Sequence, residues 1–230
     1  MIVLSMPRNG RQRIGTAFVA LLCMTFAFAA GADQPPAVSS DGLHLVKHTK
    51  FAVVYAKPGA SLKAYDKFAL LDCFVSFRKD WRQDMEDNGD NMITDDDIKR
   101  IETELAARFK QVFVKELEAG GFQLSTDAAA DVLVLRPAII NLDMEAPPND
   151  WNPTEQTYSS SAGQMTLYLE LYDSLTSTLL ARVIDPEAAS NYGVFTWQSQ
   201  AGNIAAADGI MKKWSDTLRG YMEAARSSGG

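Results

Sequence analysis

The sequence predicts an α/β fold of the α+β type, a two-layer sandwich in which two long helices cover one face of a mixed, mostly antiparallel sheet. Three observations support this prediction. An amphipathic helical pattern separates two sets of strand-like runs, an alternating segment is followed by a turn and a second apolar segment, and another helical pattern closes the chain. Hydrophobic residues make up 47% of 230, enough for one buried core, so we expect a single domain over residues 42–226.

The first strands are predicted before the long helix. Residues 51–55 form a short β-prone run that ends at a Lys-Pro-Gly turn over residues 57–59. Residues 67–77 are apolar on nearly both faces. This pattern predicts one strand in the centre of the sheet.

The first long helix is predicted over residues 95–119. Thr94 is the expected N-cap, with Asp97 completing a variant of the capping box, and the acids at the helix start meet the positive end of the helix dipole. Gly120 and Gly121 end the helix, and one of them is available for the left-handed position. The apolar stripe consists of Ile98, Ile101, Leu105, Phe109, Val112, Phe113 and Leu117.

The second half of the chain adds strands and the closing helix. Pro137 interrupts a strand region over residues 131–144 and predicts an edge or a bulge. Met165, Leu167, Leu169 and Leu171 alternate with polar residues, which predicts a half-buried antiparallel strand whose other face is open to water. The remaining expected elements are a polar loop over 147–163, a hairpin partner over 179–184, a short strand over 195–197 and a helix over 204–225.

The N-terminal 32 residues predict a secretory signal peptide. Arg8, Arg11 and Arg13 precede an apolar stretch over residues 14–30, and small residues follow. The alternatives are an uncleaved membrane anchor and a lipid attached at Cys23, although the leucine before Cys23 does not fit lipoprotein processing. We therefore expect export to the periplasm or outer envelope of a bacterium, and membrane association only through an uncleaved N-terminus.

The ends of the exported chain are expected to be loose. Residues 33–41 are small and polar without periodicity and predict a flexible tether, and residues 227–230 predict a disordered tail.

Charge and cysteine content exclude several classes of protein. Loss of the three N-terminal arginines changes the formal net charge from −7 to −10, because that segment has no acidic residue. A polyanion would be repelled, so we expect no nucleic-acid partner. Only Cys73 would remain, so no internal disulfide can form.

Residues 84–95, DMEDNGDNMITD, have nearly the spacing of an EF-hand calcium loop. The last position is Asp95 where a bidentate glutamate is usual, position 8 is Asn91, and no second copy exists. The preceding segment is predicted to be a strand end, whereas an EF-hand needs a helix there. We therefore interpret these residues as the start signal of the long helix.

Other motifs are weak. Ser76 and Lys79 match S-x-x-K, but the companion K-T-G is absent. His44 and His48 stand four apart in a segment without a helical pattern or a nearby third ligand. Arg136 lies within an apolar strand, where we expect it to pair with a core acid. We predict no cofactor, no metal ion and no catalytic residue.

The candidate partner-binding residues are Arg78, Lys79, Trp81, Arg82 and Trp151. The first four form a basic and aromatic group at a strand end, where ion pairing and stacking could hold an anionic or aromatic group. The alternative is that Arg78 and Arg82 pair with the acids that follow while Trp81 caps the core. Trp151 lies in a polar loop, where a tryptophan either folds back or contacts a partner.

Three segments resemble the bacterial family called domain of unknown function 3313. They are residues 76–81 (SFRKDW), 132–142 (VLVLRPAIINL) and 161–185 (SAGQMTLYLELYDSLTSTLLARVID). The resemblance extends from about Asp41 to about Arg226. It implies an exported envelope protein, often lipid-anchored, and no established activity or catalytic residue. This chain departs from the family pattern at the anchor, because it lacks an acceptable site for lipid attachment.

These features predict a non-catalytic binding or accessory module whose partner is an unknown envelope protein or a cell-wall component. The alternative is a hydrolase with a site assembled from acids and hydroxyls distant in sequence. A hydrolase needs a pocket in which a nucleophile meets a base, whereas a binding module needs an accessible surface near Trp81 or Trp151.

Overall fold

The computed structural model describes residues 34–87, 93–144, 157–159, 161–190, 196–198 and 200–228. The helices are α1 (Trp81–Asp87), α2 (Asp95–Ala119) and α3 (Gln200–Ser227). The strands are β1 (His44–Val46), β2 (Val53–Ala56), β3 (Lys67–Leu70), β4 (Phe74–Phe77), β5 (Gln123–Leu124), β6 (Val132–Asp143), β7 (Thr157–Ser159), β8 (Ser161–Asp173), β9 (Leu179–Ser190) and β10 (Thr196–Gln198).

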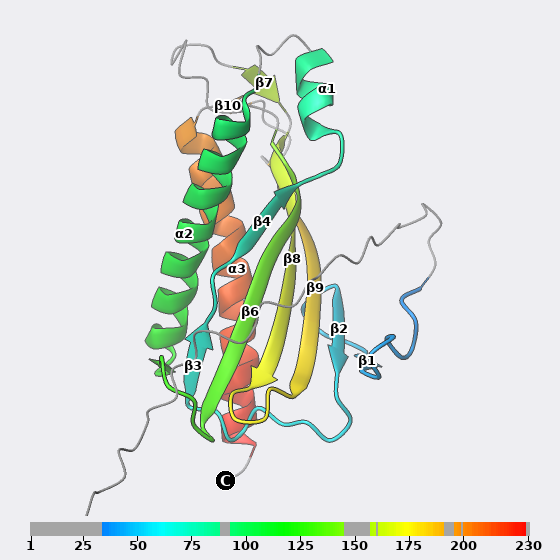
Figure 1. The fold of residues 1–230 in the computed structure, drawn as a ribbon, viewed down its shortest axis with the longest axis vertical. Helices are drawn as coiled ribbons and strands as arrows, with labels where there is room; N and C mark the ends of the chain where they lie inside the picture. The colour runs from blue at the N-terminus through cyan, green and yellow to red at the C-terminus, as the bar shows by residue number, and fades with distance from the viewer. Residues whose placement is uncertain are drawn as a thin grey trace, which may run out of the picture.

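Eight strands form one sheet in the order β1-β2-β9-β8-β6-β3-β5, and β4 also pairs with β6. The β3–β5, β3–β6 and β4–β6 pairs are parallel and the others are antiparallel. α2 and α3 lie side by side against one face, and β7 pairs with β10 in a separate small sheet (Figure 1). The predicted α+β fold is confirmed.

The core lies between the two long helices and the sheet face that they cover. Trp214 of α3 is fully buried and donates its indole N–H to Asp185 of β9 at 2.9 Å, which joins the helix to the sheet. The other fully buried core side chains include Phe109, Phe113 and Leu117 of α2, Leu133, Leu135 and Ile139 of β6, Leu167 and Leu169 of β8, and Met211 and Met222 of α3.

The predicted single central strand over residues 67–77 is two strands: β3 lies inside the sheet between β6 and β5, whereas β4 pairs with β6 alone among the described strands. Leu70 of β3 pairs with Leu135 of β6, whereas Phe74 of β4 pairs with Ala138, so the connection has one residue more than the strand opposite. Pro137 faces this interruption, which means that its missing N–H removes no ladder bond there. Of the two predicted alternatives for this proline, the edge is wrong, because β6 has strand neighbours on both sides, and the extra residue opposite Pro137 is a bulge-like irregularity.

The start and end of α2 agree with the prediction. Thr94 Oγ1 accepts from the Asp97 N–H at 3.1 Å, and Asp97 accepts from the Thr94 N–H at 3.1 Å, forming the capping box. Gly121 takes the left-handed conformation with φ of 77°. The segment before the acidic loop differs from the prediction, since residues 81–87 form the helix α1 and not a strand end.

Two other regions are more ordered than expected. β8 begins at Ser161, so part of the predicted loop over 147–163 belongs to the sheet, and β9 continues to Ser190. The predicted tether follows the domain surface: the Tyr55 hydroxyl donates to the Pro36 carbonyl at 2.9 Å, and Asp41 pairs with Arg182. These contacts hold residues 36–41 against the sheet.

Candidate functional site

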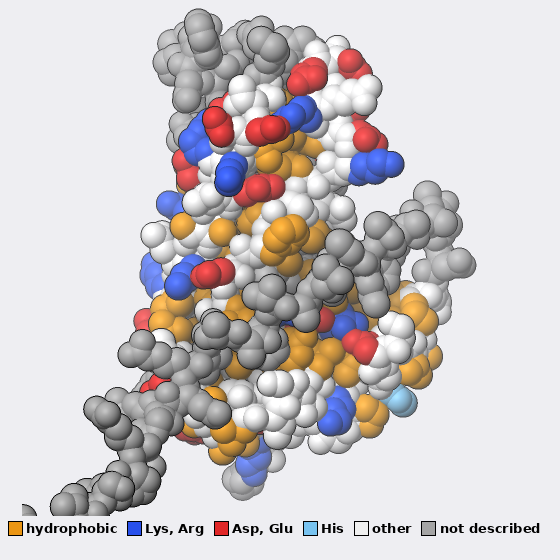
Figure 2. All heavy atoms as spheres, viewed as in Figure 1, with side chains coloured by type: hydrophobic (Ala, Val, Ile, Leu, Met, Phe, Trp, Pro, Cys, Tyr) orange, Lys and Arg blue, Asp and Glu red, His pale blue; other side chains and the backbone are white. Residues whose placement is uncertain are grey.

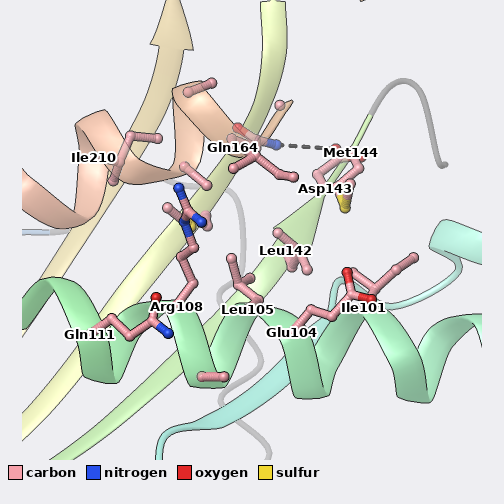
Figure 3. A pocket seen from close by; sticks show the side chains of 16 residues that line it. Ile101, Glu104, Leu105, Arg108, Gln111, Leu142, Asp143, Met144, Gln164 and Ile210 are labelled. Carbon is pink, nitrogen blue, oxygen red and sulfur yellow. Dashed lines mark hydrogen bonds between the residues drawn. The ribbon is translucent and has the colours of Figure 1, made fainter. Parts of the chain in front are cut away.

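A half-open cavity of about 350 Å³ lies between α2, the N-terminal part of α3 and the ends of β6 and β8 (Figure 3). It is lined by Ile101, Glu104, Leu105, Ala107, Arg108, Gln111, Leu142, Asp143, Met144, Gly163, Gln164, Met165, Ile204, Ala206, Ala207 and Ile210.

The two helices give the cavity aliphatic walls. Ile101 and Leu105 lie one turn apart on the stripe of α2 that also carries Phe109 into the core. Ile210 lies opposite them on α3, and Ala207 of the same helix also lines the cavity. The cavity is therefore continuous with the apolar core at the end of the sheet nearest α1 (Figures 1 and 3).

The sheet side of the cavity depends on a close contact between two backbones. Gly163 of β8 has φ of 121°, and a Cβ atom on it would lie 2.4 Å from the Asp143 carbonyl oxygen. The pairing register also shifts between Ile140 and Asp143. Only glycine permits this approach, which places Leu142 and Met165 at the cavity wall.

Most charged side chains around the cavity are held in pairs within the protein. Arg108 donates to both carboxylate oxygens of Asp208 on α3, at 2.6 and 2.5 Å. Asp143 accepts from Arg78 at 2.8 Å and from the Gln164 amide at 3.3 Å. Glu104 is held more loosely, 4.0 Å from Arg100, with 58% of its side chain exposed.

The lining offers a binding surface and little chemistry. None of the sixteen lining side chains carries a hydroxyl, thiol, imidazole or amine. Among the described residues of this cavity, only the carboxylates of Glu104 and Asp143 could act as a nucleophile or a base, and Asp143 is already held by Arg78.

Arginine and tryptophan side chains of the basic and aromatic group predicted as a partner site contact other residues of this chain. Arg78 pairs with Asp84 at 2.5 Å and with Asp143, and Arg82 pairs with Asp95. Lys79 is exposed. Figure 2 shows basic and acidic side chains close together at the α1 end of the molecule.

Trp81 packs in a small second core. Its side chain is 1% exposed, its ring stacks on Phe77 with 4.1 Å between centroids, and its N–H donates to the Met144 carbonyl at 3.0 Å. This is the arrangement that the alternative interpretation of the group describes. Trp151 lies outside the described residues.

The first and last acids of residues 84–95 are both held by arginines. Asp84 contacts Arg78 and Asp95 contacts Arg82, while residues 88–92 lie outside the described part of the chain. In the part of the chain that the structure describes, no three His, Cys, Asp or Glu side chains are grouped to hold a metal ion. His44 is in β1 and His48 follows it in a left-handed conformation with φ of 59°.

Arg136 pairs with a buried acid, as predicted, and the acid is Glu170 of β8. We call the sheet face opposite α2 and α3 the outer face. There Glu170 also pairs with Arg182 at 2.9 Å and accepts from Tyr172 at 2.7 Å and Tyr168 at 3.0 Å. Glu170 is only 2% exposed, so this face is less open to water than its alternating pattern predicts.

The cavity residues were not identified from the sequence as a site. The helical periodicity places Ile101, Leu105 and Ile210 on stripes that face the core, and it does not separate a core position from a cavity wall. The usable signal was Gly163, because a glycine within an alternating strand pattern indicates a close backbone approach or a bulge.

The comparisons with known proteins give a family and distant structural likenesses. PelC from Paraburkholderia phytofirmans, a dodecamer, is 13% identical, with 72% of this chain and 96% of that chain covered and a TM-score of 0.39. Protein XCC0632 from Xanthomonas campestris is 10% identical, with 75% and 92% covered and a TM-score of 0.42. Likenesses this distant bear on neither mechanism nor partner.

A search of the curated proteins finds no match. Within the described residues, no helix combines the length and apolar character that crossing a bilayer requires. The model of one family, described as a protein of unknown function (DUF3313), matches residues 36–218, which is most of the chain. The chain therefore belongs to the DUF3313 family, as its sequence motifs predict.

Proposed function

We propose that this protein is exported to the bacterial envelope and acts there as a non-catalytic binding module that accepts an apolar group of its partner in the cavity between α2, α3 and the sheet. The observation that carries the proposal is the lining, which is mainly aliphatic and has a polar mouth. Covering apolar surface of this kind stabilises a complex by about 25 cal/mol per Å². Preformed apolar cavities with a few polar groups at the rim are typical ligand sites.

The partner is expected at the cavity and not at the group around Trp81. The arginines of that group hold carboxylates and its tryptophan is buried, so a partner would have to break existing contacts to use it. A hydrolase receives little support from the cavity, whose lining has no hydroxyl and whose two carboxylates, Glu104 and Asp143, each already contact an arginine. Trp151 stays a prediction.

Binding can be tested with N-phenyl-1-naphthylamine, an uncharged probe that fluoresces in apolar surroundings. We expect one saturable site on the purified exported chain and loss of that site in Ala207→Phe, because the ring fills the cavity. Ala205→Phe is the matched control, since Ala205 is exposed on the same helix and does not line the cavity. Ala107→Phe, at an exposed lining position of α2, gives a second variant that leaves the core intact.

Equal probe binding in all four proteins would contradict the proposal. Export is tested separately by N-terminal sequencing of the chain recovered from the periplasm. A start at Ala30 or Asp33 supports a cleaved signal peptide, whereas an intact Met1 contradicts it.

A further inference from the structure

We infer that the occupant of this cavity is a single unbranched alkyl chain that carries an uncharged, hydrogen-bonding head group, as in an acylglycerol. The inference rests on the proposed function and adds the chemical class of the ligand. Three properties of the described residues support it: the size of the cavity, the absence of polar partners along its walls and the charge at its mouth.

The size of the cavity fits one chain. A dry apolar cavity of about 150 Å³ holds benzene, with six carbon atoms. By the same ratio a cavity of about 350 Å³ accommodates roughly 14 carbon atoms. That is the content of one medium-length acyl chain and too little for two.

The walls fit a ligand without polar atoms along its length. Leu105, Leu142, Met165 and Ile210 contribute only aliphatic or thioether surface, and no aromatic ring is among the lining residues. An inserted peptide would bring backbone N–H and C=O groups that need partners, and leaving each of them without one costs about 1–3 kcal/mol. An alkyl chain has no such groups, and flexible aliphatic walls adapt to its shape.

The mouth of the cavity disfavours an anionic head group. Arg108 already holds Asp208 and Arg78 already holds Asp143, while Glu104 contributes a loosely held negative charge. Among the described lining residues the one cation is Arg108, which is paired with Asp208, so a carboxylate or phosphate would approach Glu104 without gaining an unpaired cation. Gln111 of α2 and Gln164 of β8 line the cavity (Figure 3), and the Gln111 amide, together with the oxygen and second N–H that Gln164 keeps beyond its bond to Asp143, can donate to and accept from an ester or hydroxyl.

The test is displacement of N-phenyl-1-naphthylamine by n-alkyl maltosides below their critical micelle concentrations. We expect affinity to rise about fourfold for each added methylene and to stop rising near about 14 carbons, when the cavity is full. Dodecyl sulfate should bind at least about tenfold more weakly than dodecyl maltoside, and dodecyl trimethylammonium should not show this loss.

A variant pair isolates the role of the charge at the mouth. Glu104→Gln should narrow the difference in affinity between dodecyl maltoside and dodecyl sulfate. Glu118→Gln, at an exposed position of the same helix away from the cavity, should leave that difference unchanged. If dodecyl sulfate binds the unmodified protein as tightly as dodecyl maltoside does, the uncharged head group is wrong.

The failures of the two proposals are distinguishable. If the probe binds and Ala207→Phe abolishes that binding, but affinity is independent of chain length or an apolar helical peptide displaces the probe better than any maltoside, the alkyl chain is wrong and the binding cavity stands. If the probe does not bind the unmodified protein, both proposals fail.

Discussion

The outer face of the sheet and the face beneath the helices each bury one carboxylate, and the two carboxylates behave in opposite ways. Glu170 of β8 is 2% exposed and lies opposite Arg182 on the outer face. Asp185 of β9 is 4% exposed and lies opposite Leu167 on the helix face. Asp185 accepts from the Ala52 N–H at 2.6 Å and from the Trp214 indole.

Burial raises the pKa of both groups, and the partners decide the net result. For Glu170, the hydrogen bond from Tyr172 and the charges of Arg136 and Arg182 outweigh burial, so its pKa lies below the ordinary value. For Asp185, burial outweighs the neutral donors, so its pKa is raised. The outer face thus favours the ionised form of Glu170, whereas on the helix face the Asp185 carboxyl serves as a hydrogen-bond acceptor.

The largest expected effect is that of removing Glu170. Glu170→Ala should lower the free energy of unfolding by about 3 kcal/mol, because Arg182, 14% exposed, and Arg136 lose their shared counter-charge. Urea unfolding followed by circular dichroism measures this loss. Glu170→Gln keeps a hydrogen-bond acceptor and should cost less, so equal losses in both variants would show that charge is not the main contribution.

The next effect concerns the contact between α3 and the sheet. Trp214→Phe should lower the free energy of unfolding by about 2 kcal/mol, because Asp185 loses a buried donor. Trp81→Phe is the matched control, since Trp81 is equally buried but donates to the neutral carbonyl of Met144. A loss for Trp81→Phe as large as that for Trp214→Phe would remove the special role of the carboxyl acceptor.

The two carboxylates should give pH dependences of opposite sign. Glu170 stabilises fully above its unfolded pKa of about 4.5, and this contribution is lost as pH falls through its lower folded pKa. Asp185 contributes fully below its unfolded pKa of about 3.8, and this contribution is lost as pH rises through its higher folded pKa. The difference in unfolding free energy between the unmodified protein and Glu170→Gln should therefore grow as pH rises, whereas the difference for Asp185→Asn should shrink. A common direction would contradict the comparison.

The smallest effect is expected at the exposed end of the outer-face network. Asp41→Asn should cost less than about 1 kcal/mol, since the Asp41 side chain is 36% exposed and Arg182 keeps Glu170 as its buried partner. Thermal unfolding detects the difference. If the loss approaches that of Glu170→Ala, residues 36–41 are an integral part of the network.

The fold was predictable where one segment carries the whole pattern. The cap at Thr94, the left-handed glycine and the alternation of β8 are local, so the sequence identifies them. The partner of Arg136 depends on the register of β6 against β8, and an acid on the outward face could be matched to it only once the strands were paired. The split near Phe74 is hard to predict because Asp72 is the one charged residue in the otherwise mainly apolar run over residues 68–77, and a single charge does not show whether a strand ends or continues.

The cavity was beyond prediction for a different reason. Its walls come from apolar stripes that pack as ordinary core along most of their length. Whether such stripes close or leave a space depends on backbone geometry at Gly163 and Asp143, which hydrophobic periodicity does not report.

Pro137 and the extra residue between β3 and β4 compensate each other. Deleting Asp72 alone would join β3 and β4 into one strand opposite Pro137, which has no backbone N–H to donate to that strand. Replacing Pro137 by valine alone would leave the new backbone N–H opposite the interruption, without a strand partner. Both changes together would let β3 and β4 join while every residue kept its partner on β6. Chain length in one strand and residue type in another are therefore coupled here, and we expect a deletion at this position to cost less stability with the substitution than without it.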